Sequence, residues 1–244
     1  MPEGPSIVIL REAASVFAGE CVREVGGNSR LDLARMQGLR IHAVRSWGKH
    51  FLLQFEDFSL RVHLMLFGSY RIDERKDTAA RLSLRFDNGE LNLYACSLKY
   101  IEDDLDLAYD WSGDVMSDAW SPRAARLKLK DHPTMRVCDA LLQQSIFAGV
   151  GNIIKNEVLF RIRLHPESSV GALPPRKLTE LIREARNYSF DFLAWKKTFV
   201  LKKHWLVYTK SVCPRCRIPL HRAHLGITHR RSFYCGRCQI RHDG

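Results

Sequence analysis

The chain has 244 residues, 45% of them apolar, and a formal net charge of +11 from 38 Lys and Arg against 27 Asp and Glu. This apolar fraction suffices for a hydrophobic core and excludes wholesale disorder, and no apolar run reaches the roughly 18 to 20 residues that span a bilayer. The positive excess favours polyanionic partners, nucleic acid ahead of membrane surfaces, over charge that serves solubility alone.

The first predicted element is a helix over residues 7–18. Apolar residues recur at helical spacing from Ile7 to Phe17, Ser6 is the predicted N-cap, and Gly19 is the predicted end. No basic segment leading into an apolar run precedes this helix, so we expect no signal peptide.

Residues 21–105 then change to short apolar runs with period two, which predicts strands in series. The turn sequence DNGE at 87–90 predicts a type I′ hairpin, because Asn-Gly suits positive φ angles. Many short strands in series favour a β-sandwich or a barrel-like domain. The predicted strands are RIHAVRSWG, KHFLLQF, LRVHLMLF, RLSLRF and LNLYAC.

The helical period returns after a mixed stretch that we interpret as a linker. MRVCDALLQQSIFA, NIIKNEVLFRI and RKLTELIREARNYSFDFLAW each predict a helix. Gly149 and Gly151 bracket a tight turn between the first two helices, and Asn152 is the predicted N-cap of the second. Free backbone N–H groups at such a turn can bind a phosphate, although the same geometry occurs in purely structural helix pairs.

Two CxxC pairs, CPRC at 213–216 and CGRC at 235–238, are separated by eighteen residues. This spacing places four thiolates on two knuckles of a β-hairpin and predicts one structural Zn²⁺ per chain; a redox dithiol pair or chance is the alternative. An odd cysteine count with three scattered members favours a reducing compartment, and hence a cytoplasmic location. The predicted zinc ligands are Cys213, Cys216, Cys235 and Cys238; the scattered cysteines are Cys21, Cys96 and Cys138.

Three segments together resemble the formamidopyrimidine-DNA glycosylase / endonuclease VIII family. They are MPEGP at the N-terminus, AGVGNIIKNEVLF at the turn, and the paired CxxC motifs, and they follow the family's order. The resemblance implies a multidomain α and β fold, with an N-terminal β-sandwich that carries an N-terminal helix, and a C-terminal helix–two-turn–helix domain with a zinc-finger β-hairpin. The expected boundaries are 1–120 for the sandwich domain, 121–134 for the linker, 135–205 for the helical domain and 206–244 for the finger.

The resemblance also implies an enzyme of base-excision repair, a bifunctional DNA glycosylase and AP lyase whose partner is damaged DNA. We expect the protein to be a monomer and not to bind a membrane. Removal of Met1 would leave Pro2 with a secondary amine that attacks C1′ and forms a Schiff base, followed by β/δ-elimination. Glu3 would serve as general acid and base. Lys49, in SWGKHF, matches the family's supporting catalytic lysine.

Other residues match the family's DNA-binding positions. Asn152 matches its phosphate-binding asparagine, and Arg230 matches the zinc-finger arginine that grips phosphates around the everted nucleotide. Met65, Leu66 and Phe67 are candidates for the wedge that replaces lost stacking; the alternative is ordinary core. Since Leu66 and Phe67 are consecutive, they cannot both be buried in a one-sided sheet, which favours an exposed loop.

The chain departs from the family at position 6, where Ser6 replaces the usual glutamate. It also lacks an RRFG-like loop and a long loop before the finger, which favours the endonuclease VIII branch and oxidised pyrimidines as substrates. The loss of a carboxylate leaves open an alternative, a damage- or structure-specific DNA-binding protein, or a crosslink-unhooking glycosylase, with altered or lost base excision. A zinc-ribbon transcription or RNA factor is a third reading, which the N-terminal motif does not favour.

Overall fold

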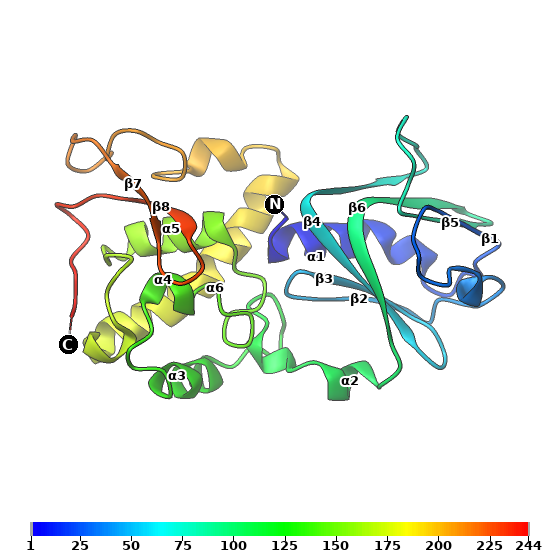
Figure 1. Ribbon diagram of the computed structural model, residues 1–244, viewed down its shortest axis with the longest axis horizontal. Coiled ribbons are helices and arrows are strands. Elements are labelled where there is room, and N and C mark those ends of the chain that lie inside the picture. Colours follow the sequence, from blue (N-terminus) through cyan, green and yellow to red (C-terminus); the bar gives the residue numbers. More distant parts are fainter. Residues whose placement is uncertain (1, 244) are drawn as a thin grey trace. The chain divides into compact units, whose positions relative to one another are not determined.

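The computed structural model describes residues 2–243 and divides into two compact units, Met1–Asp110 and Trp111–Gly244 (Figure 1). The N-terminal unit combines one helix with a β-sandwich, and the C-terminal unit combines helices with a two-stranded hairpin. Within residues 2–243, no helix combines the length and the apolar character needed to cross a membrane.

Helix α1 (Gly4–Ala14) opens the N-terminal unit and continues into a 3-10 turn at Ser15–Phe17. The predicted helix is confirmed, but the predicted cap is wrong. Glu3 occupies the N-cap position, where its carbonyl accepts the backbone N–H of Ser6 at 2.8 Å. Ser6 therefore lies inside the first turn. The helix starts early because Pro5, which has no N–H and a fixed φ, suits a first turn.

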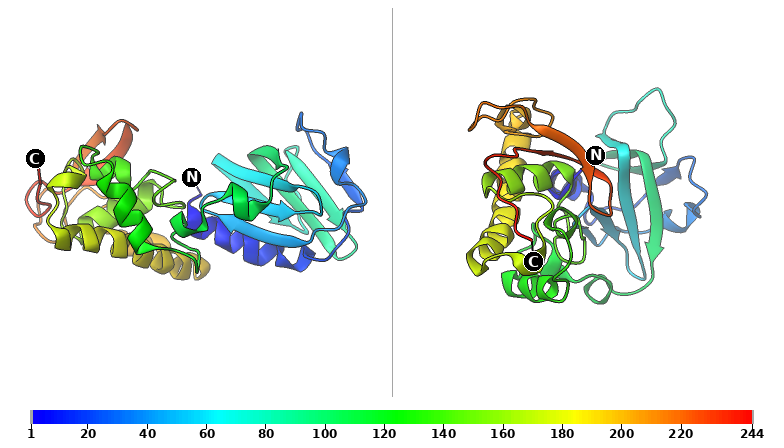
Figure 2. Two further views of the ribbon diagram at one scale, coloured as in Figure 1. Left: turned by 90° about the horizontal axis from the view of Figure 1, so that it is seen from below. Right: turned by 60° about the vertical axis from the view of Figure 1, so that its left-hand side comes forward.

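One antiparallel sheet of six strands follows, in the order β1-β5-β6-β4-β3-β2. All the strands predicted from period two are confirmed. Helix α1 lies along the strands, where it contacts β2, β3 and β4 (Figure 2, left). The strands are β1 (Glu24–Gly26), β2 (Ala43–Trp47), β3 (His50–Gln54), β4 (Ser59–Ile72), β5 (Leu82–Phe86) and β6 (Gly89–Ile101); a 3-10 turn at Ala34–Met36 and helix α2 (Leu105–Ala108) complete the unit.

The long strands β4 and β6 belong to both layers of the sandwich. Their pairing shifts register between Leu64 and Ser69, and Ala95 has a φ of 47°. The first half of β4 pairs with β3, whereas the first half of β6 pairs with β5. Alternate side chains from both layers and from α1 form one buried cluster, because period two directs them to the same interior.

The hairpin between β5 and β6 is at the predicted place, but its turn type is not the predicted one. Phe86 pairs with Gly89, so Asp87 and Asn88 form the loop. Within the described part of the chain, Gly89 has a positive φ of 147° and neither loop residue has one. A type I′ turn needs positive φ at both loop residues, so the register has placed the glycine one position later.

The C-terminal unit contains two long helices, and one predicted helix is largely absent. Residues 135–148 form the single turn α4 and then a series of turns. The side chain of Gln144 donates to the carbonyls of Leu142 and Val150 and accepts from the N–H of Gly149, so it links the turns that follow α4. The other two predicted helices are confirmed as α5 and α6, and the stretch 121–134 contains α3. The elements are a 3-10 turn at Trp111–Gly113, α3 (Pro122–Lys130), α4 (Val137–Ala140), α5 (Asn152–Arg161), a 3-10 turn at Val170–Ala172, α6 (Pro175–Lys197), a 3-10 turn at Leu201–His204, β7 (His221–Leu225) and β8 (Arg230–Tyr234).

Candidate functional site

The predicted nucleophile and its neighbouring carboxylate lie at the start of α1. Glu3 is 1% exposed and Pro2 is half-buried. The first backbone N–H groups of a helix have no partner within the helix, and the aligned peptide dipoles favour negative charge there. The fold therefore holds a buried carboxylate one residue from the candidate amine.

Lys49 lies in the two-residue turn between β2 and β3, which is closed by the pair Trp47 and His50. The turn requires glycine at Gly48, where φ is 52°. Lys49 is half-buried rather than extended into solvent. The hairpin thus fixes the position of this ammonium group on a rigid element.

A cluster of histidines next to Lys49 did not emerge from the sequence. His50 and His63 face each other across β3 and β4, with ring centroids 5.5 Å apart, and His50 Nδ1 lies 3.1 Å from the Tyr109 hydroxyl. Burial, followed by the charges of Arg61, His63 and Lys49, lowers the pKa of His50 to about 4. Burial and the Lys49 charge also lower the pKa of His63. Both rings are therefore favoured in the neutral form near neutral pH.

The three wedge candidates lie on β4 between Leu64 and Ser69, where pairing with β6 is interrupted. Met65 is 49% exposed, Leu66 52% and Phe67 84%, so the alternative of ordinary core is wrong. A Cβ on Gly68 would approach the Met65 nitrogen to 2.7 Å, and only glycine fits this close turn.

Asn152 lies beside the finger rather than at a cap. Gly151 is the N-cap and Asn152 is the first residue of α5, so the predicted cap role is wrong. The Asn152 side-chain amide donates to the carbonyl of Arg231 at 3.0 Å, and Asn156 donates to the same carbonyl at 3.2 Å. Arg230, one residue earlier, is exposed at the start of β8. The structure therefore brings Asn152 and the Arg230 segment together (Figure 1).

Two buried carboxylates that sequence reasoning missed attach the finger to the helices. Glu157 on α5 accepts the backbone N–H groups of Leu206, Val207 and Tyr208 at 2.9 to 3.0 Å. Asp139 on α4 accepts the N–H groups of two residues at the hairpin tip, and the hydroxyl of one of them, at 3.1 to 3.2 Å. The only sequence signal was an acidic residue within an apolar helical stretch.

The four finger cysteines fit a tetrahedral zinc ion. Their sulfur atoms all lie within 4.8 Å of one another, and Cys213 Sγ lies 3.8 Å from Cys238 Sγ. Zn–S bonds of about 2.3 Å in a tetrahedron separate sulfur atoms by about 3.8 Å. The backbone N–H of Cys216 donates to Cys213 Sγ at 3.4 Å, which favours a thiolate there. Four sulfur ligands leave no position for a reacting water, so the site suits a structural ion.

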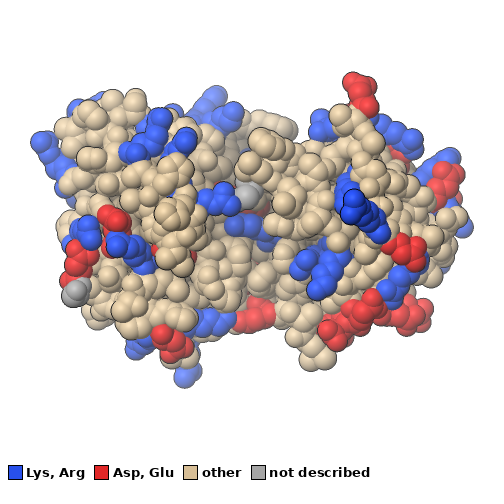
Figure 3. All heavy atoms as spheres, in the orientation of Figure 1, with Lys and Arg blue, Asp and Glu red and all other residues tan. Residues whose placement is uncertain are grey.

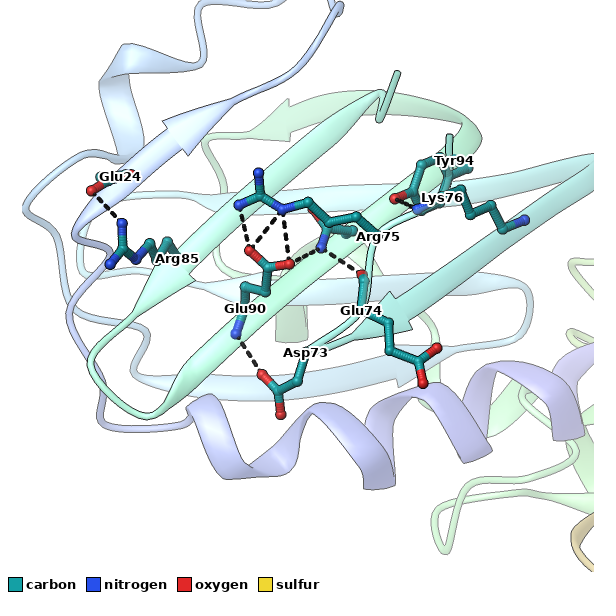
Figure 4. Close-up of polar contacts among 9 residues, drawn as sticks. Glu24, Asp73, Glu74, Arg75, Lys76, Arg85, Glu90 and Tyr94 are labelled. Carbon is teal, nitrogen blue, oxygen red and sulfur yellow. Dashed lines mark hydrogen bonds and ion pairs between the residues drawn. The ribbon is translucent and has the colours of Figure 1, made fainter. Parts of the chain in front are cut away.

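The sandwich also has a cavity of about 660 Å³ lined in part by the segment after β4, and both of its arginines are paired with glutamates (Figure 4). Arg75 forms an ion pair with Glu90 and Arg85 with Glu24, at 2.5 and 2.8 Å. The Asp73 carboxylate accepts the backbone N–H of Glu90. Both arginines of the cavity are therefore paired, whereas Lys76 donates to the neutral Ser69 hydroxyl, and none of the predicted site residues lines the cavity.

The predicted site residues fall into two groups, one in each unit. Pro2, Glu3, Lys49 and the wedge candidates belong to the N-terminal unit, and Asn152, Arg230 and the cysteines to the C-terminal unit. On the face that Figure 3 shows, Lys and Arg are spread over both units, and Asp and Glu gather most densely along one edge of the N-terminal unit.

Comparisons with known proteins agree with this arrangement. The family model described as "Formamidopyrimidine-DNA glycosylase N-terminal domain" matches residues 1–97, and that described as "Formamidopyrimidine-DNA glycosylase H2TH domain" matches residues 114–189. A formamidopyrimidine-DNA glycosylase of Chloroflexus aurantiacus is 25% identical over 290 residues, which cover 98% of each chain. Endonuclease 8-like 3 of Xenopus laevis is 29% identical over 225 residues, but the match covers 87% of this chain and only 36% of that relative.

Solved structures give the same fold. The Lactococcus lactis formamidopyrimidine DNA glycosylase, solved non-covalently bound to DNA that contains an AP site, superposes with a TM-score of 0.85 at 21% identity, over 98% of this chain and 100% of that one. The sandwich with its N-terminal helix, the helical H2TH domain and the clustered cysteines are therefore the fold of that family. On these matches, the chain belongs to the formamidopyrimidine-DNA glycosylase / endonuclease VIII family.

Proposed function

We propose that this chain is a bifunctional DNA glycosylase and AP lyase that removes oxidised bases from damaged DNA in base-excision repair. The observation that carries this proposal is the buried carboxylate of Glu3 beside Pro2 at the start of α1. Membership of the family supports it, since relatives are named as DNA glycosylases.

The chemistry requires Pro2 to be the first residue of the mature chain. An α-amino group has a pKa of about 7.7 to 8.0, so a useful fraction is neutral at pH 7, and the adjacent helix N-terminus disfavours the protonated form. The neutral amine attacks C1′, the glycosidic bond breaks, and the base leaves. The resulting iminium ion withdraws electrons, so that loss of the C2′ proton expels the 3′ phosphate. Glu3 donates and accepts the protons of sugar-ring opening and elimination.

DNA would be held through both units. Lys49 supplies a fixed cation for the phosphate beside the lesion. Asn152 and the exposed Arg230 act on phosphates from the C-terminal unit, and the amide of Asn152 also holds the strand that carries Arg230. The exposed Met65, Leu66 and Phe67 fill the stack after the nucleotide is everted.

The substrate class we propose is oxidised pyrimidines, as in the endonuclease VIII branch. The absence of an RRFG-like loop and of a long segment before the finger supports this choice. Ser6 lies in the first turn of α1, where a hydroxyl is compatible with the helix. The departure at position 6 therefore bears on substrate range rather than on folding.

We further propose that the four cysteines bind one structural Zn²⁺ per chain, and that the protein acts on DNA as a cytoplasmic monomer. The sulfur geometry supports the metal, and the three cysteines outside the cluster, Cys21, Cys96 and Cys138, agree with a reducing compartment. For the domains we propose the sandwich, the helical domain and the finger at 206–244; the compact units divide after Asp110 rather than at the expected residue 120, and the expected linker at 121–134 contains α3.

Borohydride trapping on abasic and thymine-glycol DNA tests this function. Protein whose mass confirms loss of Met1 should become covalently attached to both substrates. Pro2→Gly and Glu3→Gln should reduce the trapped product by about 100-fold or more, since each removes a group that takes part in bond making or proton transfer. Glu56→Gln, which changes an exposed carboxylate in the same unit, is the matched control.

Binding measured alongside separates the two main alternatives. Tight binding to the same DNA with no trapped product would overturn the lyase and favour a damage-binding protein. A panel of oxidised purines and pyrimidines then tests the substrate class.

A further inference from the structure

A groove of about 380 Å³ lies between α3 and α6 in the C-terminal unit, away from α5 and the finger. Its surface is mainly apolar, and arginines surround it. The lining residues are Trp120, Pro122, Arg123, Arg126, Thr179, Ile182, Arg183, Arg186 and Asn187.

All the charge in this groove is positive. Four arginines line it, and no Asp or Glu does so among residues 2–243. Arg126 donates to the Thr179 hydroxyl at 2.6 Å, and Arg186 donates to the carbonyls of Val115 and Ser117 at 3.0 and 2.8 Å. These acceptors are neutral, so they orient both guanidinium groups without cancelling their charge.

The other two arginines have no such partner. Arg123 and Arg183 are exposed, and within the part of the chain that the structure describes no hydrogen bond or ion pair engages either of them. Glu184 interacts electrostatically with Arg183, but it does not line the groove. The sandwich cavity differs, because there Arg75 and Arg85 are each paired with a glutamate. The groove therefore keeps guanidinium groups available for an anionic partner.

The apolar floor of the groove favours a partner with apolar side chains as well as negative charge. Trp120 and Ile182 belong to the buried core of this unit, and their outer atoms line the groove together with Pro122. A duplex DNA backbone satisfies the arginines through its phosphates but keeps its apolar base faces inside the stack, so it would leave this floor uncovered. A carboxylate-rich peptide with an aromatic or aliphatic side chain matches both the floor and the rim.

We propose that this groove docks an acidic peptide segment of a partner protein, with one large apolar side chain over Trp120 and flanking carboxylates on Arg123 and Arg183. The site uses no residue of the proposed DNA-binding surface, so a peptide bound there would not compete with DNA for the same side chains.

Fluorescence anisotropy with a labelled peptide, EEDEFLDEED, tests the docking site. The zinc-loaded 244-residue chain should bind it. Both QQNQFLNQQN and EEDESSDEED should bind at least about tenfold more weakly, because one lacks charge and the other lacks the apolar anchor. The double variant Arg123→Glu/Arg183→Glu should also lose about tenfold or more. Lys130→Glu/Arg176→Glu reverses two exposed charges on the same helices outside the groove and should stay close to wild type.

Three results would contradict or support the docking site. Equal losses in the two double variants, or no preference for EEDEFLDEED over its control peptides, would overturn the proposal. Displacement of the peptide by the oligonucleotide dT10, with dT10 binding lost in Arg123→Glu/Arg183→Glu, would make the groove a nucleic-acid site and overturn it as well. Trapping on abasic DNA should be unchanged in both double variants, which separates this proposal from that of the lyase.

Discussion

The β-sandwich encloses twenty buried side chains in one cluster, whereas the cluster at the finger contains five among the described residues, and two of those are cysteines. Burial of apolar area at roughly 25 cal/mol per Å² can stabilise the first but not the second. The finger instead depends on four thiolates and on carboxylates that reach it from α4 and α5. Two regions of one chain therefore reach stability by different physical means, and each should fail under a different challenge.

The largest expected effect is at the metal. Cys235→Ser should release zinc and unfold the finger, because structural zinc supplies about 10 to 16 kcal/mol in small metal-dependent folds. Zinc content and hydrogen exchange would show loss of protection in residues 206–243 and unchanged protection in the sandwich. Cys21→Ser, outside the cluster, is the matched control and should keep its zinc. Retention of stoichiometric zinc by Cys235→Ser would refute the assignment.

The next largest effect concerns Glu157, the buried carboxylate on α5 that binds the start of the finger. Glu157→Gln replaces a buried carboxylate that accepts three backbone N–H groups. We expect a loss of about 3 kcal/mol in the free energy of unfolding, because charge-assisted bonds are lost and an amide donor meets N–H donors. Urea unfolding of the C-terminal unit measures it. Glu180→Gln, in a partly exposed ion pair, should lose less than about 1 kcal/mol; a similar loss in both would contradict this role of Glu157.

The sandwich should respond to acid rather than to metal removal. Burial lowers the pKa of His50 to about 4 in the fold from its ordinary value of 6.5, so the unfolded chain binds the proton more readily. Its contribution to stability is complete above pH 6.5 and is lost as the pH falls through 4, up to about 3 kcal/mol. Urea unfolding of the sandwich between pH 7 and 4 measures this. His50→Gln should flatten the profile, and the exposed His42→Gln should not; matching profiles would contradict the assignment.

The smallest expected effect concerns a single phosphate contact at the surface of the finger. Arg230→Ala should weaken DNA binding and lower the slope of log K against log salt by about one, as expected for one phosphate contact. Titrations at several salt concentrations measure the slope, and zinc content should stay unchanged because Arg230 is exposed. Lys130→Ala, on α3, is the control. A slope identical to wild type would remove Arg230 from the DNA contact.

Local pattern predicted much of this molecule. Period two identified the strands of the sandwich, helical period identified α1, α5 and α6, and the CxxC spacing identified four cysteines whose sulfur atoms do converge. These succeeded because each signal is carried by residues close in sequence, whose geometry depends little on the rest of the chain. The same alternation indicated that Leu66 and Phe67 could not both be buried; both are exposed, although they lie within β4 rather than in the expected loop.

Tertiary structure decided the features whose partners are distant. The helix predicted over 135–148 stops after one turn, and the Gln144 side chain bonds to the carbonyls of Leu142 and Val150 in the turns that follow. His50 meets Tyr109 across 59 positions, and Glu157 meets Leu206 across 49. Arg123 and Arg183 share a groove only because α3 packs on α6. Composition and motifs specify which chemical groups a chain carries. Which of these groups are buried, which form ion pairs or hydrogen bonds, and which charges stay unpaired depend on the distant segments that the core brings together.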